Sequence, residues 1–86
     1  MPYIDQKQRE KYDEILEVFF QVEIETKGDL EYCIFSLMKR YMDTRKTRYS
    51  TLHDCAYAAQ HCADEFRRRF LDKREDEAIK KNGDVE

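Results

Sequence analysis

The sequence is poor in the residues that interrupt helices and build tight turns. Its 86 residues include only two glycines and one proline, which is low for a fold of many short strands. No uninterrupted apolar run approaches the ~18 residues that a membrane-spanning helix requires. We therefore expect a protein built from helices, with no segment that enters a membrane.

Cysteine is also scarce, and three cysteines cannot all pair within one chain. No basic segment followed by an apolar run marks a secretory signal, so we expect reduced thiols and a cytoplasmic location. Cys33, Cys55 and Cys62 are of the right type for zinc, but they lack the Cys-x-x-Cys spacing of structural zinc sites. We therefore expect the three cysteines to be buried and to pack as small hydrophobic residues. We predict no bound metal and no cofactor.

The charges are unevenly distributed along the chain. Residues 1–38 carry 4 basic and 9 acidic side chains, residues 39–74 carry 10 and 5, and residues 75–86 carry 2 and 5. The middle of the chain is therefore basic and lies between two acidic segments. Such a distribution suits an anionic partner. It equally lets basic and acidic parts attract one another, within one copy or between copies.

Three stretches of the sequence repeat apolar residues at the period of an α-helix. The first runs from Asp5, a candidate N-cap, to about Glu23. Its apolar stripe consists of Tyr12, Ile15, Leu16 and Phe19. Acidic residues occupy much of the remaining surface, so we expect a helix with one apolar side and a charged face in water.

The second stretch covers roughly 29–43 and follows a break at Gly28, a residue that adopts backbone conformations others resist. Asp29 or Thr26 can cap its first turn. Its apolar side keeps the helical period without a miss and consists of Leu30, Cys33, Ile34, Leu37, Met38 and Tyr41.

The third stretch begins at about Thr51, which with Asp54 fits a capping box, and continues to Lys73 or beyond. Its stripe has small residues in the first half and aromatic ones in the second: Leu52, Cys55, Ala56, Ala59, Cys62, Ala63, Phe66 and Phe70. The small side chains allow another helix to approach closely.

Three amphipathic helices with short connections predict an all-α protein, a small antiparallel three-helix bundle. Residues 1–86 form one domain, with about 78–86 as a loose C-terminal tail after the turn signal Asn82-Gly83. Helix two presents its apolar side to the other two helices. Six tyrosines and five phenylalanines exceed what this small interior needs, so we expect a homo-oligomer, most simply a dimer.

No constellation of residues indicates catalysis. Carboxylates such as Asp13 and Asp64 do not occupy the inward positions that a carboxylate-lined metal bundle requires. His53 and His61 stand eight residues apart, and no Gly-rich loop offers a cradle for an oxyanion or a phosphate. A metal-assisted hydrolase is the least supported function, and we predict a protein that is not an enzyme and has no catalytic residue.

Basic side chains gather at two places, with aromatic residues among them. In an up-down-up bundle these places lie at opposite poles, so one chain need not join them, although an oligomer can. Aromatic rings beside a basic surface can stack on bases, whereas basic residues near a helix C-terminus also favour its dipole without any ligand. The candidate ligand-binding residues are Arg40, Arg45, Arg48, Tyr49, Arg67, Arg68 and Arg69.

Five short segments occur in a characteristic order along the chain: PYI at 2–4, GDLEY at 28–32, TLHD at 51–54, EFRRR at 65–69 and NGDV at 82–85. Together they resemble a family of small uncharacterised proteins from phages, prophages and bacteria. In that family pattern Asn stands where this chain has Glu31 and His53, and Tyr often stands where it has Arg67. The resemblance implies a compact cytoplasmic protein of phage origin, and it brings no catalytic residue.

These expectations describe a non-catalytic, self-associating helical interaction protein with an unidentified protein partner. The resemblance adds a phage or prophage accessory role, or one that modulates the host. The alternative is a binder of nucleotides or nucleic acid, including a sponge for a signalling nucleotide, that uses the arginine clusters and adjacent aromatic rings. The negative net charge of −3 argues against a general nucleic-acid binder.

Overall fold

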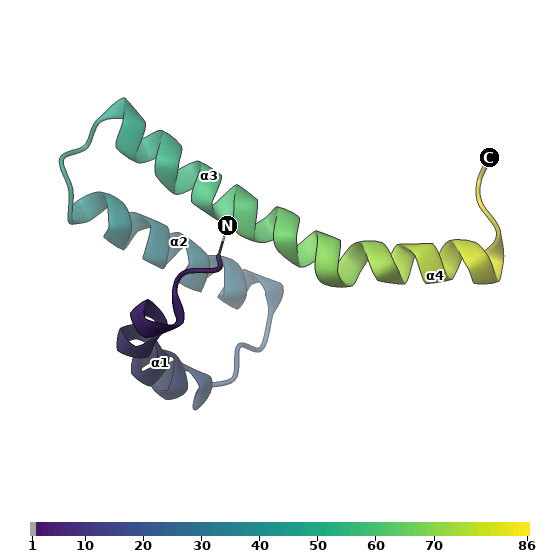
Figure 1. The fold of residues 1–86 in the computed structure, drawn as a ribbon, viewed down its shortest axis with the longest axis horizontal. Coiled ribbons are helices and arrows are strands. Elements are labelled where there is room, and N and C mark those ends of the chain that lie inside the picture. The colour runs from purple at the N-terminus through teal and green to yellow at the C-terminus, as the bar shows by residue number, and fades with distance from the viewer. Residues whose placement is uncertain (1) are drawn as a thin grey trace.

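The computed structural model describes residues 2–86, and all the regular structure in this range is helical. Residues 2–86 form four α-helices and one π-helical turn: α1 (Gln6–Phe20), α2 (Lys27–Asp43), α3 (Tyr49–Phe66), η1 (Arg67–Leu71) and α4 (Asp72–Asn82). Figure 1 labels the α-helices. The predicted all-α class is confirmed. The three predicted helices correspond to α1, to α2, and to α3 with its continuation.

Side-chain caps fix the beginnings of the first two helices. The Oδ1 atom of Asp5 accepts a first-turn backbone N–H at 3.2 Å, which confirms Asp5 as the N-cap of α1. Thr26 is the N-cap of α2, because its Oγ1 accepts the N–H of Asp29 at 3.0 Å. Gly28 lies inside the first turn of α2 and has no left-handed backbone. The break is therefore made by the cap and not by the glycine.

Two predicted helix boundaries are wrong. The first helix ends at Phe20, about three residues before the predicted end. α3 begins at Tyr49 with Arg48 as its N-cap, and no side-chain hydrogen bond closes this cap. The predicted capping box fails because the hydroxyl of Thr51 donates to the carbonyl oxygen of Lys46 at 3.0 Å. Thr51 therefore ties the connection to the helix and does not begin the helix.

The C-terminal half of the chain is one long helical rod, in which α3 passes through η1 into α4 (Figure 1). The rod ends at Asn82, where Gly83 adopts a φ of 87° and its N–H bonds to the carbonyl oxygen of Ile79 at 2.8 Å. Only glycine adopts this conformation readily. The loose tail predicted from residue 78 is therefore confined to 83–86.

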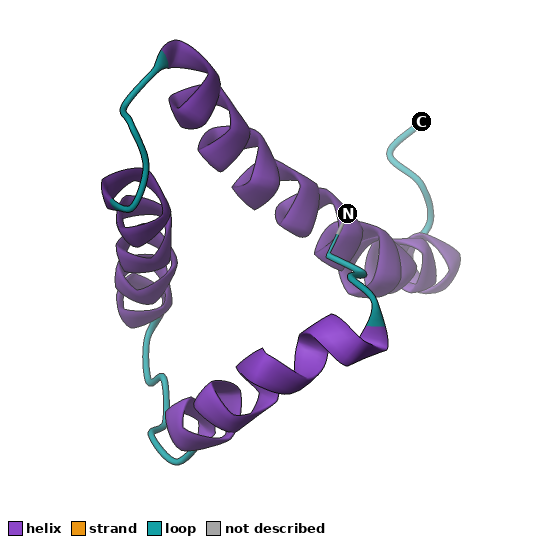
Figure 2. Ribbon diagram, turned by 60° about the vertical axis from the view of Figure 1, so that its left-hand side comes forward, coloured by secondary structure: helices purple, strands orange, loops and turns teal. Residues whose placement is uncertain are grey.

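Among the helices of residues 2–86, α2 and α3 are the only pair outside the rod that lies close together. They lie antiparallel, and the Sγ atom of Cys55 donates to the carbonyl oxygen of Met38 at 3.3 Å. No Cα atom of α1 lies within 8 Å of a Cα atom in any other helix of the described chain. In Figure 2, α1, α2 and α3 accordingly run along three sides of a triangle.

The predicted interior is not closed within one chain. None of residues 2–86 is buried, and the predicted interior residues Leu37 and Phe66 are 71% and 64% exposed. The radius of gyration is 16.7 Å, against about 12 Å for a compact domain of this length. The half-buried residues are Arg9, Cys33, Met38, Met42, Thr51, Cys55, Ala59 and Glu65. The physical reason is the placement of α1, which leaves the third side of the bundle uncovered.

Candidate functional site

The first predicted arginine cluster lies at the pole where α2 ends and α3 begins. Arg40 belongs to the last turn of α2, while Arg48 and Tyr49 begin α3. Between them, the guanidinium carbon of Arg45 lies 3.7 Å from the centre of the Tyr41 ring. One of its nitrogens donates to the Tyr41 carbonyl oxygen at 3.2 Å. The structure thus brings these predicted residues to one end of the helix pair, and Arg45 is already engaged there.

The second predicted cluster, Arg67 to Arg69, opens the π-helical turn. The Nε atom of Arg68 donates to Oε1 of Glu65 at 2.8 Å, and Nη1 of Arg69 donates to the Tyr3 hydroxyl at 2.9 Å. The Glu65 side chain is only 11% exposed, whereas that of Arg68 is 71% exposed. These contacts tie the rod to itself and to the segment before α1.

One chain does not join the two clusters into a single surface. α3 is 18 residues long and separates them, which corresponds to about 27 Å at the rise of an α-helix. A ligand that contacts both clusters would therefore need to be long, or to bind more than one copy.

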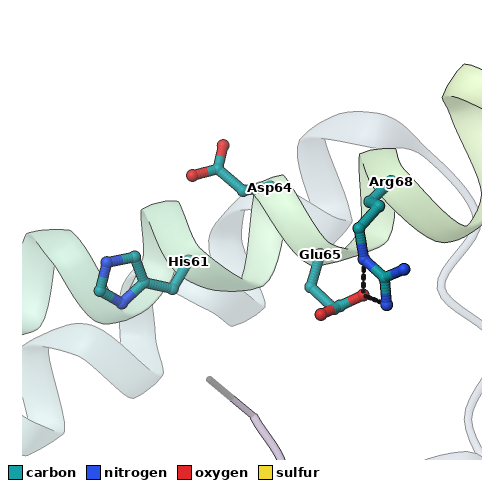
Figure 3. A pocket seen from close by; sticks show the side chains of 4 residues that line it. All are labelled: His61, Asp64, Glu65 and Arg68. Carbon is teal, nitrogen blue, oxygen red and sulfur yellow. Dashed lines mark hydrogen bonds and ion pairs between the residues drawn. The ribbon is translucent and has the colours of Figure 1, made fainter.

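A shallow depression of about 270 Å³ lies on α3 beside the second cluster, lined by His61, Asp64, Glu65 and Arg68. Figure 3 shows that these side chains come from successive turns of one continuous helix. Glu65 and Arg68 turn towards each other, while Asp64 points to the other side (Figure 3). The four residues form no wall opposite one another, so the depression is a surface feature and not an enclosed site.

A series of aromatic rings along α3 was not predicted. Tyr49, His53, Tyr57 and His61 follow one another at intervals of four, and neighbouring ring centres lie 5.8, 4.2 and 6.0 Å apart. Residues four apart share a helix face, so this spacing was readable in the sequence. It was missed because the apolar stripe groups residues by hydrophobicity and not by ring shape.

The three thiols are free, and they differ in exposure. Cys33 and Cys55 are half-buried, whereas Cys62 is exposed. The expectation that all three are buried is wrong, most clearly for Cys62, because α1 lies away from α3 and does not cover it. Within residues 2–86 no group of three or more His, Cys, Asp or Glu side chains is placed to hold a metal ion.

A larger apolar groove lies at the junction of α1 and α2. It measures about 520 Å³ and is lined by Val18, Phe19, Val22, Glu23, Ile24, Asp29, Tyr32 and Cys33. Its apolar wall is open to solvent, with Val22 71% and Tyr32 75% exposed. Glu23 and Asp29 make its edge acidic. The sequence could not predict this junction groove, because it depends on the angle between two helices.

Fold and surface together define a small all-helical protein whose amphipathic helices leave their apolar sides open. None of the helices described is long and apolar enough to cross a bilayer. The chain belongs to the family described as Domain of unknown function (DUF6899), whose model matches residues 1–85. No curated protein and no solved structure matches it. The family agrees with the expected resemblance to uncharacterised proteins and assigns no activity.

Proposed function

We propose that this protein is a non-catalytic helical interaction protein that works by self-association. The observation that carries the proposal is the lack of any buried residue in 2–86. The chain exposes 8439 Å², about 3,000 Å² more than a compact monomer of its mass. Because exposed apolar surface costs about 25 cal/mol per Å², covering the open helix faces with another protein surface is strongly favoured.

A second copy of the chain is the simplest partner that would cover these open helix faces. Interfaces of obligate dimers bury about 2,000–5,000 Å² summed over both copies, or about 1,000–2,500 Å² per copy. The excess exposure of one chain is therefore more than large enough to supply its share of such an interface. Two-fold symmetry allows the acidic part of one copy, residues 1–38, to face the basic part of the other, residues 39–74. Opposite charges at such an interface guide the encounter and fix its register.

The same proposal includes a biological role and a location. The role is that of a phage or prophage accessory protein or of a protein that modulates the host, and the location is cytoplasmic. The first is supported by the ordered resemblance of five segments to small phage and bacterial proteins. The second is supported by three free thiols, since disulfides are rare in reducing compartments. In this role the assembled protein binds a further protein, which can be identified by pull-down from native cells.

The test of self-association is the dependence of thermal stability on protein concentration. If unfolding accompanies dissociation, the thermal midpoint rises as the protein is concentrated. Circular dichroism melts over a hundredfold range of concentration would measure this. A midpoint that stays constant over that range, for a chain that melts cooperatively, would contradict the proposal.

One observation favours a second function, the binding of a nucleotide or of single-stranded nucleic acid. Arg48 and the 81% exposed Tyr49 stand together at the start of α3, next to His53 in the ring series. A labelled oligonucleotide and a nucleoside triphosphate serve as probes, with Arg48→Ala as the variant. Binding should weaken steeply with salt if arginines contact phosphates. No binding to the unaltered protein at low salt would remove this function.

A further inference from the structure

The groove at the junction of α1 and α2 is not filled by its own chain. Val18, Val22 and Tyr32 in its wall are 63%, 71% and 75% exposed. Because apolar pockets are stabilised by filling, this groove is a place for an apolar segment. Its acidic edge, formed by Glu23 and Asp29, favours a segment that carries positive charge beside its apolar residues.

One segment of the chain has this combination. The aromatic segment, defined as residues 66–71, holds Phe66 and Phe70 with ring centres 4.9 Å apart. The two rings are 64% and 53% exposed, and Leu71 beside them is 42% exposed. Three consecutive arginines lie between the rings in sequence. Apolar bulk and positive charge thus occur together, opposite in charge to the edge of the groove.

The backbone of this segment is also distinctive. Five of its six residues form the π-helical turn η1. Single π turns within α-helices are found frequently at functional sites. The turn lies between α3 and α4, in the interior of the long rod and away from both of its ends (Figure 1).

The segment does not reach the groove of its own chain. No Cα atom of η1 lies within 8 Å of a Cα atom in α1 or α2. The continuous rod and the antiparallel contact of α3 with α2 fix the direction in which η1 extends. A second copy carries the same segment and meets no such constraint.

We infer that in the self-associated protein the aromatic segment of each copy occupies the junction groove of the other. This inference rests on the proposed self-association and adds the pair of surfaces that make the contact. The exchange is reciprocal, so both grooves are filled in a closed dimer and no free groove remains to extend a fibre. The acidic groove edge then faces the partner's arginines.

Crosslinking between two different copies tests this pairing. The first copy carries Cys55→Ser and Cys62→Ser, so that only Cys33 in the groove wall remains. The second copy carries Leu71→Cys and has all three native cysteines replaced by serine. The two copies are mixed, allowed to exchange and treated with a short bis-maleimide. In the control pair, Lys80→Cys near the end of α4 takes the place of Leu71→Cys.

The inference predicts a covalent product of one copy with the other for Leu71→Cys, at a yield at least several times that of the Lys80→Cys control. Each copy has a single thiol, so this product cannot arise within one chain. Equal yields in the two pairs, or no product from a sample of dimeric mass, would overturn the inference and leave self-association standing. A monomeric mass in the untreated samples would overturn both.

A second measurement does not depend on added cysteines. Phe70→Ala removes one ring of the aromatic segment, and Phe35→Ala makes the same change at a 67% exposed phenylalanine of α2 outside both surfaces. Central aromatic residues carry much of the affinity of an interface. We expect Phe70→Ala to raise the dimer dissociation constant at least tenfold and Phe35→Ala to change it far less. Equal effects of the two variants would count against the pairing.

Discussion

The Thr26 side chain closes the clearest helix cap in the protein. Its Oγ1 accepts the N–H of Asp29 at 3.0 Å, and loss of such a cap costs about 1 kcal/mol. We expect Thr26→Ala to lower the thermal midpoint by about 4–8 °C at fixed protein concentration. Thr47→Ala, an exposed change in the connection before α3, is the matched control. An unchanged midpoint for Thr26→Ala would show that the cap does not limit stability.

The two glycines are expected to respond in opposite ways to alanine. Gly28 lies in the first turn of α2, and an added Cβ would meet only Oγ1 of Thr26 at 3.8 Å, an ordinary contact. Alanine loses less conformational entropy than glycine when the chain folds, so Gly28→Ala should stabilise the protein by about 0.4–1 kcal/mol. Gly83→Ala should instead loosen the end of α4, because the φ of 87° at this position strains any side chain.

Urea unfolding followed by circular dichroism measures the first effect, and amide hydrogen exchange in the last turn of α4 measures the second. Loss of stability on Gly28→Ala would mean that the chain uses a conformation at this glycine other than the helical one described above.

The sequence predicted a helix end correctly where the capping residue had no competing hydrogen-bond partner nearby. Asp5 and the Asn82-Gly83 turn fulfil their predicted roles because their partners lie within a few residues. Thr51 does not cap the helix as predicted, because its hydroxyl donates to the carbonyl oxygen of Lys46 in the preceding connection. A capping pattern in the sequence is therefore ambiguous wherever the preceding loop has a carbonyl oxygen that the same hydroxyl can bond.

Among the elements, the π-helical turn makes a specific prediction about deletions. A π turn contains one more residue than an α turn, so removal of Arg67 can be absorbed by converting η1 to α-helix. Removal of Ala59 from α3 cannot be absorbed in this way, because α3 has no extra residue there. The deletion rotates the rest of the rod by about 100° relative to α2. We expect the Ala59 deletion to lower the thermal midpoint clearly more than the Arg67 deletion, whose cost is limited to one arginine of the aromatic segment. Equal losses would contradict the assigned turn.

Periodicity predicted the helices but not their arrangement. The apolar repeat sets which residues share a helix face, and the sequence placed the beginnings of all three helices to within about two residues. The end of the third was left open at Lys73 or beyond, and the rod continues to Asn82. The direction of α1 depends on the short connection 21–26, which has no helical repeat. The junction groove and the isolation of α1 follow from that direction. The arginine clusters were predicted by residue type, and the up-down-up order of the helices predicted that they lie at opposite poles. Only the distance between them, about 27 Å, follows from the length of α3.

At the scale of the whole molecule, charge and apolar surface act together. The acidic part, residues 1–38, and the basic part, residues 39–74, attract across the proposed interface, and this attraction is screened by salt. We expect the dimer dissociation constant to rise as salt is raised from low to physiological levels, without complete dissociation, because burial of apolar surface is not screened. Titration by light scattering would measure this dependence. Tighter association at physiological salt than at low salt would argue against charge pairing between copies.

In the proposed dimer, a second copy closes the apolar faces that one chain leaves open. Sedimentation equilibrium over a dilution series tests it most directly, because it measures mass without a label or a probe. We expect a mass of twice the 10.5 kDa of the chain, falling towards the single-chain value only at high dilution. A mass of 10.5 kDa at every concentration, with helical circular dichroism retained, would contradict it.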